Sequence, residues 1–223
     1  MSDARKLLAT ADVVLLDFDG PVTPLMPPPA NIATADAGRA VLRRHDVEMP
    51  DEIQTTSDHL AVIRWVADLG ADVLSEVEDA CIHAEVKAAR TAVPTDGAHE
   101  LLAELHRQNV PVVIVSNNAA EAIDVYLTRH RLTNYVTAVV GRPARRPDLM
   151  KPNPFEVTEA LRQVSGGSAR AVLIGDSVSD VEVARATAVR SIGYAKTEKR
   201  GEELEEAGAD AITTTIAALL EAF

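Results

Sequence analysis

Short, continuously apolar runs recur along this chain, and most of them stop at a polar residue or a glycine. They occupy residues 13–16, 112–115, 137–140, 171–174, 191–194 and 211–212. Apolar runs without alternation are typical of strands that are buried on both faces, as in a parallel sheet. Aromatic residues make up only 3% of the chain, so we expect a core built mainly from Ala, Val, Leu and Ile.

Amphipathic stretches separate these runs at residues 97–107, 119–130 and 154–164. A repeated order of strand, helix and strand indicates βαβ units and an α/β layered domain. Ligands of such folds bind just beyond the carboxyl ends of the strands. The residues that follow each apolar run are therefore the first place to search for chemistry.

Residues 23–93 break this rhythm, because they contain no convincing strand. The interval opens with a cluster of prolines at positions 24, 27, 28 and 29, which is typical of a stiff linker. Helical patterns follow at 33–45, 57–69 and 73–92, and Pro94 ends the interval. We predict a helical insert after the first strand, with a return hinge near residues 93–95.

Charge and composition exclude several classes of protein. The chain has 22 Lys and Arg against 34 Asp and Glu, a net charge of −12, whereas nucleic-acid binding needs dense positive charge. It has no run of 18 apolar residues and no signal-peptide pattern. Its single cysteine, Cys81, excludes an intrachain disulfide. We expect a cytoplasmic monomer or homodimer without nucleic-acid or membrane partners.

The strongest local pattern is Asp17-Phe18-Asp19-Gly20, directly after the first apolar run. Residues two apart in a strand point to the same side, so two carboxylates can face one site while Gly20 lets the chain turn away. One carboxylate can attack phosphorus, and the other can donate and then accept a proton. A solvated turn is the alternative interpretation of this pattern taken alone.

Two further patterns follow later strands. Ser116 and Asn117 come directly after residues 112–115, where a hydroxyl and the first amides of a helix can hold an anion; simple helix capping is the alternative. Lys151 precedes a helix that begins with proline. It is either a surface lysine or a fixed cation that neutralises phosphate and keeps the nucleophile ionised.

The last pattern places Gly175 and Asp176 at the end of a strand, with Asp180 in the first turn of the next helix. Carboxylates gathered at one place repel each other unless a cation lies among them. Oxygen ligands of this kind favour Mg²⁺, which also bridges to phosphate. The helix dipole alone can explain Asp180 but not the Gly-Asp pair.

Taken in order, these patterns resemble the haloacid dehalogenase (HAD) superfamily. The four motifs match as Asp17-Phe18-Asp19-Gly20, Ser116, Lys151 and Gly175-Asp176-Ser177-Val178-Ser179-Asp180. The resemblance covers nearly the whole chain, including residues 94–97, and the tail at 193–210 is similar to the phosphoglycolate-phosphatase-like branch. It implies a Rossmann-like, doubly wound core over residues 1–23 and 94–223, with residues 24–93 forming a helical cap.

The resemblance also implies a reaction, the hydrolysis of a small phosphorylated metabolite by a phosphoric monoester hydrolase. Asp17 would be the nucleophile that forms an aspartyl-phosphate, and Asp19 would be the general acid and base. Ser116, Asn117 and Lys151 would bind the phosphoryl group.

The implied cofactor is Mg²⁺, held by the carboxylate of Asp17, the backbone carbonyl of Asp19 and the carboxylate of Asp176. Asp180 and Gly20 would support the site. Closing the cap would exclude water and position the substrate. The chain departs from the family at Pro21, where Thr or Val is usual, and proline removes a backbone donor.

Three alternatives remain open at this point. A phosphomutase would share every motif, and a catalytically idle binding module could use the same scaffold; a dehalogenase fits the metal-binding pattern less well. The cap residues His59, Arg64, Trp65, His83 and Lys87 could face the site, but the sequence assigns a role to none of them. We interpret the basic cluster at positions 142, 145 and 146 as a solvated loop.

Overall fold

The computed structural model describes residues 2–164 and 170–223. Its centre is a six-stranded, all-parallel sheet with the strand order β3-β2-β1-β4-β5-β6. The strands are β1 (Val13–Leu16), β2 (Val112–Val115), β3 (Ala138–Val140), β4 (Ala171–Gly175), β5 (Arg190–Tyr194) and β6 (Ala211–Thr213). All six strands that the apolar runs predict are confirmed, to within one residue at either end. The predicted domain limits include residues 1 and 165–169, which lie outside the described residues.

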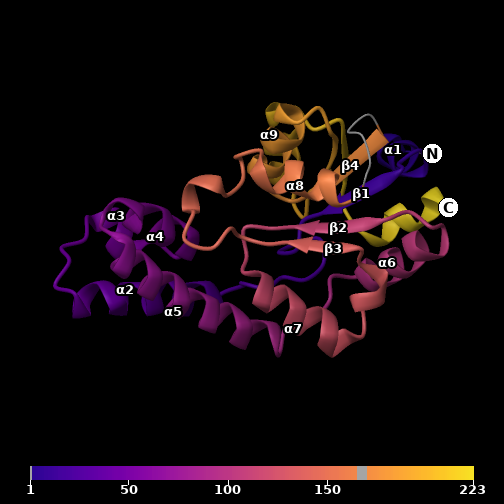
Figure 1. Ribbon diagram of the computed structural model, residues 1–223. Coiled ribbons are helices and arrows are strands. Elements are labelled where there is room, and N and C mark those ends of the chain that lie inside the picture. The colour runs from indigo at the N-terminus through magenta and orange to yellow at the C-terminus, as the bar shows by residue number, and fades with distance from the viewer. Residues whose placement is uncertain (1, 165–169) are drawn as a thin grey trace.

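Helices cover both faces of this sheet (Figure 1). They are α1 (Asp3–Ala9), α6 (Ala98–Arg107), α7 (Ala120–His130), α8 (Phe155–Gln163), α9 (Val178–Ala186), α10 (Glu198–Ala207) and the 3-10 helix η5 (Ala217–Ala222). Two short 3-10 turns, η2 (Thr133–Tyr135) and η3 (Pro147–Leu149), lie in connections. The α/β layered fold predicted from the sequence is thereby confirmed.

Alternation along the strands divides the core into two layers. On β1, Val14 and Leu16 pack with α1, α6 and α7, whereas Val13 and Leu15 pack with α8 and α9 on the other face. Successive side chains of a strand point to opposite faces, and both faces here are covered by helices. A strand in that position must be apolar at every residue, which explains the continuous apolar runs.

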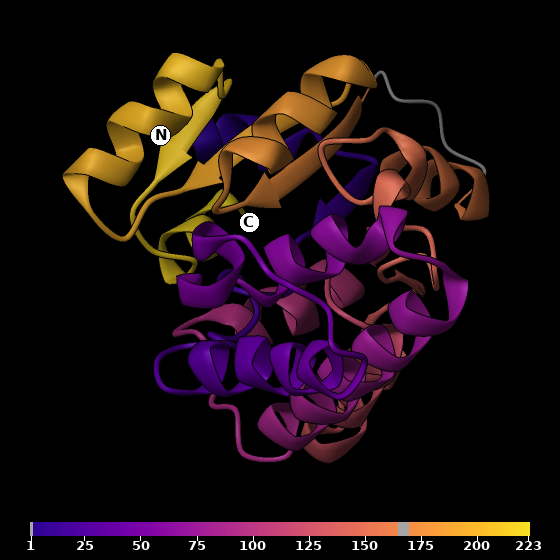
Figure 2. The ribbon, with the colours of Figure 1, turned by 90° about the vertical axis from the view of Figure 1, so that its left-hand side faces the viewer.

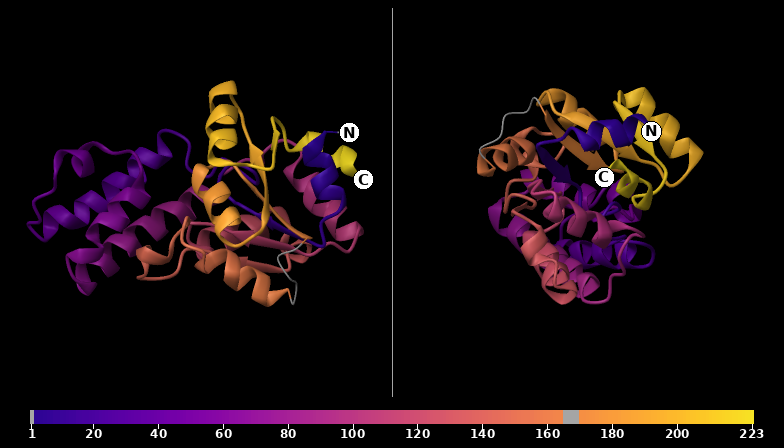
Figure 3. Two further views of the ribbon diagram at one scale, coloured as in Figure 1. Left: turned by 90° about the horizontal axis from the view of Figure 1, so that it is seen from above. Right: turned by 90° about the vertical axis from the view of Figure 1, so that its right-hand side faces the viewer.

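The chain between β1 and β2 contains the remaining helices, which lie together beyond one end of the sheet. They are α2 (Ala30–Arg44), α3 (Asp51–Thr55), α4 (His59–Trp65), η1 (Val66–Asp68) and α5 (Ala71–Ala89). They share a hydrophobic cluster that includes Leu42, Ile63 and Val77. Figure 2 shows these helices in front of the sheet domain, and in Figures 1 and 3 they lie at the end opposite α1 and η5.

The helical insert differs in detail from the sequence prediction. The stretch 57–69 is divided, because the side chain of Asp58 accepts a hydrogen bond from the Leu60 amide and starts α4 at His59, and a 3-10 turn follows. Gly70, with φ of +116°, separates this turn from α5. The five-residue helix α3 was not predicted, because a helix this short buries only Ile53 and shows no periodicity.

Every helix in the described part of the chain is too short or too polar to span a lipid bilayer. This finding agrees with the absence of a long apolar run in the sequence.

We expect Ile114→Ala to lower the free energy of unfolding by about 2–5 kcal/mol, because it leaves a cavity in a close-packed core. Ile114 is fully buried on β2. Urea unfolding followed by circular dichroism measures the change. Ile32→Ala is the matched control, since Ile32 is 45% exposed and its loss should stay within about 0.5 kcal/mol. Equal losses at the two positions would contradict this description of the core.

Candidate active site

The candidate site lies where the strand order reverses direction, at the carboxyl ends of the central strands. β1 pairs with β2 on one side and with β4 on the other, and ligands of open α/β sheets bind at such a switch point. A cavity of about 460 Å³ opens there. Its lining includes six of the residues predicted from sequence, Asp17, Asp19, Ser116, Asn117, Lys151 and Asp176.

Lys151 connects the parts of this site. Its Nζ donates to Asp17 Oδ1 (2.9 Å), to Asp180 Oδ1 (2.6 Å) and to the carbonyl oxygen of Val115 (3.0 Å). The side chain is 2% exposed, so Lys151 is not a surface lysine. The nearby carboxylates of Asp17 and Asp180 raise its pKa despite burial, which keeps the ammonium charged.

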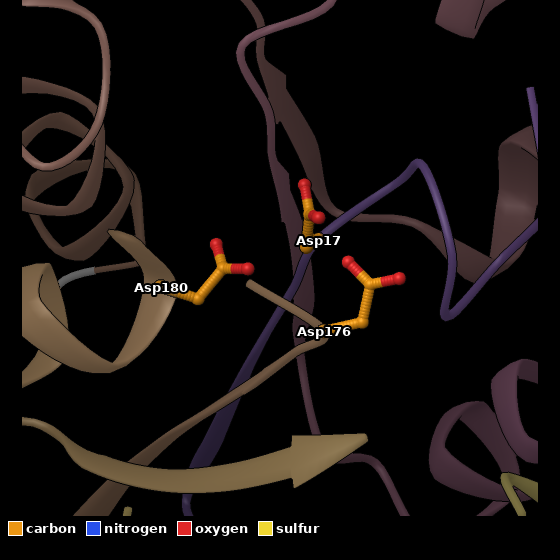
Figure 4. A group of neighbouring side chains, drawn as sticks. All are labelled: Asp17, Asp176 and Asp180. Atoms are coloured by element: carbon orange, nitrogen blue, oxygen red, sulfur yellow. The ribbon is translucent and has the colours of Figure 1, made fainter. Parts of the chain in front are cut away.

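The carboxylates of Asp17 after β1, Asp176 after β4 and Asp180 at the start of α9 lie close to one another (Figure 4). Oxygen atoms of Asp17, Asp176 and Asp180 lie within 4.8 Å of one another. Burial and then the charge of Asp180 raise the pKa of Asp17 well above its usual range, because Lys151 offsets only part of the repulsion. Burial and Asp180 likewise raise the pKa of Asp176 to about 7.

Asp180 has a structural environment that differs from that of the other two. Its Oδ2 accepts hydrogen bonds from Ser177 N (3.1 Å) and Ser177 Oγ (2.6 Å). The first of these and the bond from Asp180 N to Ser177 Oγ (3.2 Å) form a capping box at the start of α9. Its Oδ1 accepts from Lys151. A side chain at Gly175 would overlap the Asp180 carboxylate, so the glycine permits this close approach of strand and helix.

Asp19 lies on the turn after β1, and its Oδ1 accepts a hydrogen bond from the Leu25 amide (2.8 Å). Burial raises the pKa of Asp19. The same turn depends on Gly20, which has φ of +116°, and a Cβ there would overlap the carboxylate of Asp176. The sharp turn and the approach of Asp176 therefore both require glycine at this position.

Ser116 and Asn117 both line the cavity but have different hydrogen-bond partners. Ser116 is 1% exposed, and its Oγ donates to Asn118 Oδ1 (3.1 Å). The side chain of Asn117 forms two hydrogen bonds with the backbone of Lys151. Lys151 N donates to Asn117 Oδ1 (2.7 Å), and Asn117 Nδ2 donates to the Lys151 carbonyl (3.3 Å). Asn117 thus holds the lysine segment beside the strand ends.

The donor set fits a hard divalent cation. Its ligand atoms are carboxylate oxygens, which Mg²⁺ and Ca²⁺ prefer. Burial and then the charge of Asp180 raise the pKa values of Asp17 and Asp176, and a cation among these carboxylates would offset both effects. Because both oxygens of Asp180 are engaged by Lys151 and Ser177, Asp17 and Asp176 are the carboxylates best placed to bind directly.

The insert supplies the opposite wall of the cavity, where Asn31, Ser57, Asp58, His59, Leu60 and Arg64 line it. Arg64 Nη2 also donates to the Lys151 carbonyl (3.2 Å). His59 is 4% exposed and hydrogen-bonds Glu85 on α5. Of the five insert residues that the sequence left unassigned, His59 and Arg64 are the two that line this cavity.

The interpretation of the basic cluster as a solvated loop is wrong for Arg142. This residue is 6% exposed, and its guanidinium pairs with Glu78 (3.1 Å) and Glu85 (3.0 Å) on α5. In the sequence, the position of Arg142 directly after the strand β3 and Gly141 was the feature that could have indicated its burial. Two glutamates seven residues apart on the apolar face of α5 were the matching signal in the insert.

Glu156, in the first turn of α8, is buried beneath the site, and neither carboxylate oxygen has a hydrogen-bond partner among the described residues. Burial raises its pKa to about 7, although the charge of Lys151 opposes this shift. A group with these properties is protonated more readily in the folded chain than in the unfolded chain.

Residues 51–194 match the family model of haloacid dehalogenase-like hydrolases. The phosphoglycolate phosphatase of Aliivibrio fischeri is 25% identical over 230 residues, which cover 93% of this chain and 94% of that protein. The 2-hydroxy-3-keto-5-methylthiopentenyl-1-phosphate phosphatase of Microcystis aeruginosa is 27% identical over 183 residues, covering 78% and 80%.

Solved structures share the fold. The crystal structure of a predicted phosphatase from Clostridium acetobutylicum superposes with a TM-score of 0.72 at 20% identity, covering 95% of this chain and 97% of that one. At this identity the likeness concerns the fold alone, a parallel sheet with flanking helices.

We expect the change in unfolding free energy caused by Glu156→Gln, measured relative to the wild type, to be more favourable at pH 8 than at pH 5. The folded chain retains the Glu156 proton between about pH 4.5 and 7 while the unfolded chain loses it, so the wild type loses stability as the pH rises through that range. The shift corresponds to at most about 3 kcal/mol.

Urea unfolding of both proteins at both pH values measures this effect. Subtracting the stability difference at pH 5 from that at pH 8 cancels the pH-independent cost of burying the amide that Glu156→Gln introduces. A stability difference between Glu156→Gln and the wild type that is the same at pH 5 and pH 8 would contradict it.

Proposed function

The chain belongs to the haloacid dehalogenase-like hydrolases, and from this premise we propose that it is a Mg²⁺-dependent phosphatase acting through an aspartyl-phosphate. The observation that carries the proposal is the contact of buried Lys151 with Asp17 at the mouth of the cavity. An ammonium on one carboxylate oxygen orients the side chain and leaves the other oxygen, Oδ2, to attack phosphorus.

In the first step, Oδ2 of Asp17 forms a bond to phosphorus while the bond between phosphorus and the leaving-group oxygen breaks. Asp19 gives its proton to that oxygen, so the leaving group departs as an alcohol. The Leu25 amide on Oδ1 of Asp19 supports this role, because it fixes the carboxyl group and reserves Oδ2 for the proton. The raised pKa of Asp19, caused by burial, agrees with an acid.

In the second step, Asp19 takes a proton from water as the water oxygen attacks phosphorus, and the bond to Asp17 breaks. Inorganic phosphate leaves, and both aspartates return to their first state. Between the two steps the phosphoryl oxygens would accept hydrogen bonds from Ser116 and from Lys151. Ser116 must turn its hydroxyl away from Asn118 to do so, while Asn117 keeps Lys151 in position.

Mg²⁺ would be held by the carboxylates of Asp17 and Asp176 and by the backbone carbonyl of Asp19, with Asp180 and Gly20 supporting the arrangement. When bound, the ion supplies positive charge that favours ionised Asp17 and balances the phosphoryl oxygens. The close carboxylates and their raised pKa values support this assignment.

We propose 2-phosphoglycolate or a similar small phosphate ester as substrate, because two relatives that align with 72% and 93% of the chain are phosphoglycolate phosphatases. Residues 24–93 would act as the cap over the core formed by residues 1–23 and 94–223. The polar wall that this insert gives the cavity suits a small polar leaving group. A mutase would use the same residues but release no phosphate.

We expect the wild type to hydrolyse para-nitrophenyl phosphate and 2-phosphoglycolate in Mg²⁺, and EDTA to abolish both activities. Asp17→Asn should lower the rate by several orders of magnitude, because it removes the nucleophile while keeping its size. Phosphate release measures the rate. Asp12→Asn is the matched control, since Asp12 lies on the surface in an exposed pair with Arg170 and should leave the rate within about twofold.

Full activity of Asp17→Asn would refute the covalent route, and full activity after removal of metal would refute the Mg²⁺ requirement. Interconversion of a phosphorylated sugar without release of phosphate would indicate a mutase instead. Lack of turnover of every ester tested, together with no binding of Mg²⁺, would favour an idle binding module.

A further inference from the structure

A single buried carboxylate, Glu85 on α5, accepts five hydrogen bonds where the insert meets the core. Its donors are His59 Nε2 (2.9 Å), Asn118 Nδ2 (3.2 Å), Ala119 N (3.3 Å) and both terminal nitrogens of Arg142 (3.0 Å each). The side chain is 0% exposed. Helix α5 therefore places a charge inside the core, directly behind the residues that follow β2.

Glu85 is ionised in this environment. Burial opposes ionisation, but Arg142 and then His59 lower its pKa to about 2. An ionised carboxylate only accepts hydrogen bonds. His59 must therefore carry a proton on Nε2, and Asn118 must direct its NH₂ group toward Glu85.

Through the orientation of Asn118, the hydrogen bonds to Glu85 also affect Ser116 on the proposed phosphate-binding side. With its NH₂ group on Glu85, Asn118 presents Oδ1 to Ser116, whose Oγ lies 3.1 Å away. Arg142 adds a second connection, because its Nη1 also donates to the carbonyl of Asn117 (2.8 Å). Glu85 thus determines the geometry of the segment 116–118.

His59 lines the same cavity from the side of the insert. It lies on the insert, whereas Ser116 and Asn118 lie on the core, and all three line the cavity. Ser116 and Lys151, which would bind the phosphoryl group, lie at the strand ends on the core side of the cavity, and His59 faces them from the insert. A leaving group attached to that phosphoryl group would therefore extend toward His59.

We propose that Glu85 is a positioning residue that holds His59 as a contact for the leaving group at a set distance from the phosphate-binding segment 116–118. The inference rests on the proposed function and extends it. The preferred substrates would then have a polar group that can hydrogen-bond Nδ1 of His59, at the distance from the phosphate that separates His59 from residues 116–118. Esters whose leaving group is larger or apolar would be disfavoured. The insert supplies both His59 and Glu85, so the preference is built into the cap.

Glu78 provides a matched control on the same helix. It is also buried and also pairs with Arg142 (3.1 Å), and it accepts a hydrogen bond from the Arg145 amide (2.7 Å). Its partners are arginines that do not line the cavity. Glu78→Gln and Glu85→Gln therefore each remove one buried charge from the same network, but only Glu85→Gln removes a charge that contacts cavity residues.

The first test needs no turnover. Long-range ¹H–¹⁵N NMR of the six histidines, with His59→Gln used to assign the His59 signal, should show neutral His59 as the Nε2–H tautomer in the wild type. Glu85→Gln should change this signal, and Glu78→Gln should leave it unchanged. An Nδ1–H tautomer in the wild type, or the same change in both variants, would overturn the proposal even if Glu85→Gln folds poorly.

The second test compares two substrates. Glu85→Gln and His59→Ala should each lower kcat/KM for 2-phosphoglycolate by on the order of 10- to 100-fold, and for para-nitrophenyl phosphate by clearly less. Glu78→Gln should stay within about threefold for both. If Glu85 acts through His59, adding Glu85→Gln to His59→Ala should lower kcat/KM for 2-phosphoglycolate little further.

Equal losses for both substrates, or equal losses in Glu85→Gln and Glu78→Gln, would show a merely structural role and overturn the proposal. A wild type that hydrolyses neither ester would refute the proposed function and with it the leaving-group contact. The NMR comparison would then still decide whether Glu85 positions His59.

Discussion

The buried ammonium of Lys151 is the interaction on which the rest of the site depends. It contacts Asp17 after β1, the Val115 carbonyl at the end of β2, and Asp180 at the start of α9. Carboxylates buried without a cation are costly, and removing one partner of a buried pair leaves the other uncompensated. Three segments that are far apart in sequence are therefore held at one point by a single charge, and the excess of negative charge around it makes the place suitable for a divalent cation.

A second layer of charge connects the insert with the core. Glu85 and Arg142 pair with each other and contact residues 117 and 118. The two connections between the insert and the core are joined as well, since Thr23 Oγ1 donates to the Val93 carbonyl (2.7 Å). Thr95 Oγ1 donates to the carbonyl of Gly20 (2.5 Å), so the segment that returns from the insert contacts the turn that carries Asp19. The insert and the turn beside the site are thus connected through specific hydrogen bonds.

The sequence predicted the strands best and the solvent-facing helices least. Strands between two helical layers are apolar at every position, and such runs are easy to recognise. Helix α10 was missed because Leu204 is its only buried residue, which leaves almost no periodicity to detect. The site residues Asp17, Ser116 and Asp176 could be grouped in advance because the carboxyl ends of parallel strands lie at one edge. No such rule applies to Glu85 or Arg142, whose burial depends on how the insert packs.

The sequence by itself determined the parallel sheet, the helical insert and the set of residues at the strand ends, since periodicity and motif order are local properties of the chain. Tertiary structure alone decided that Asp180 is bound by Lys151 and Ser177 while Asp176 remains available to a cation. It also decided that Arg142 is buried, that Glu85 contacts both sides of the cavity, and that His59 rather than His83 or Lys87 lines it. Contacts between distant segments depend on packing, and packing is a property of the whole fold.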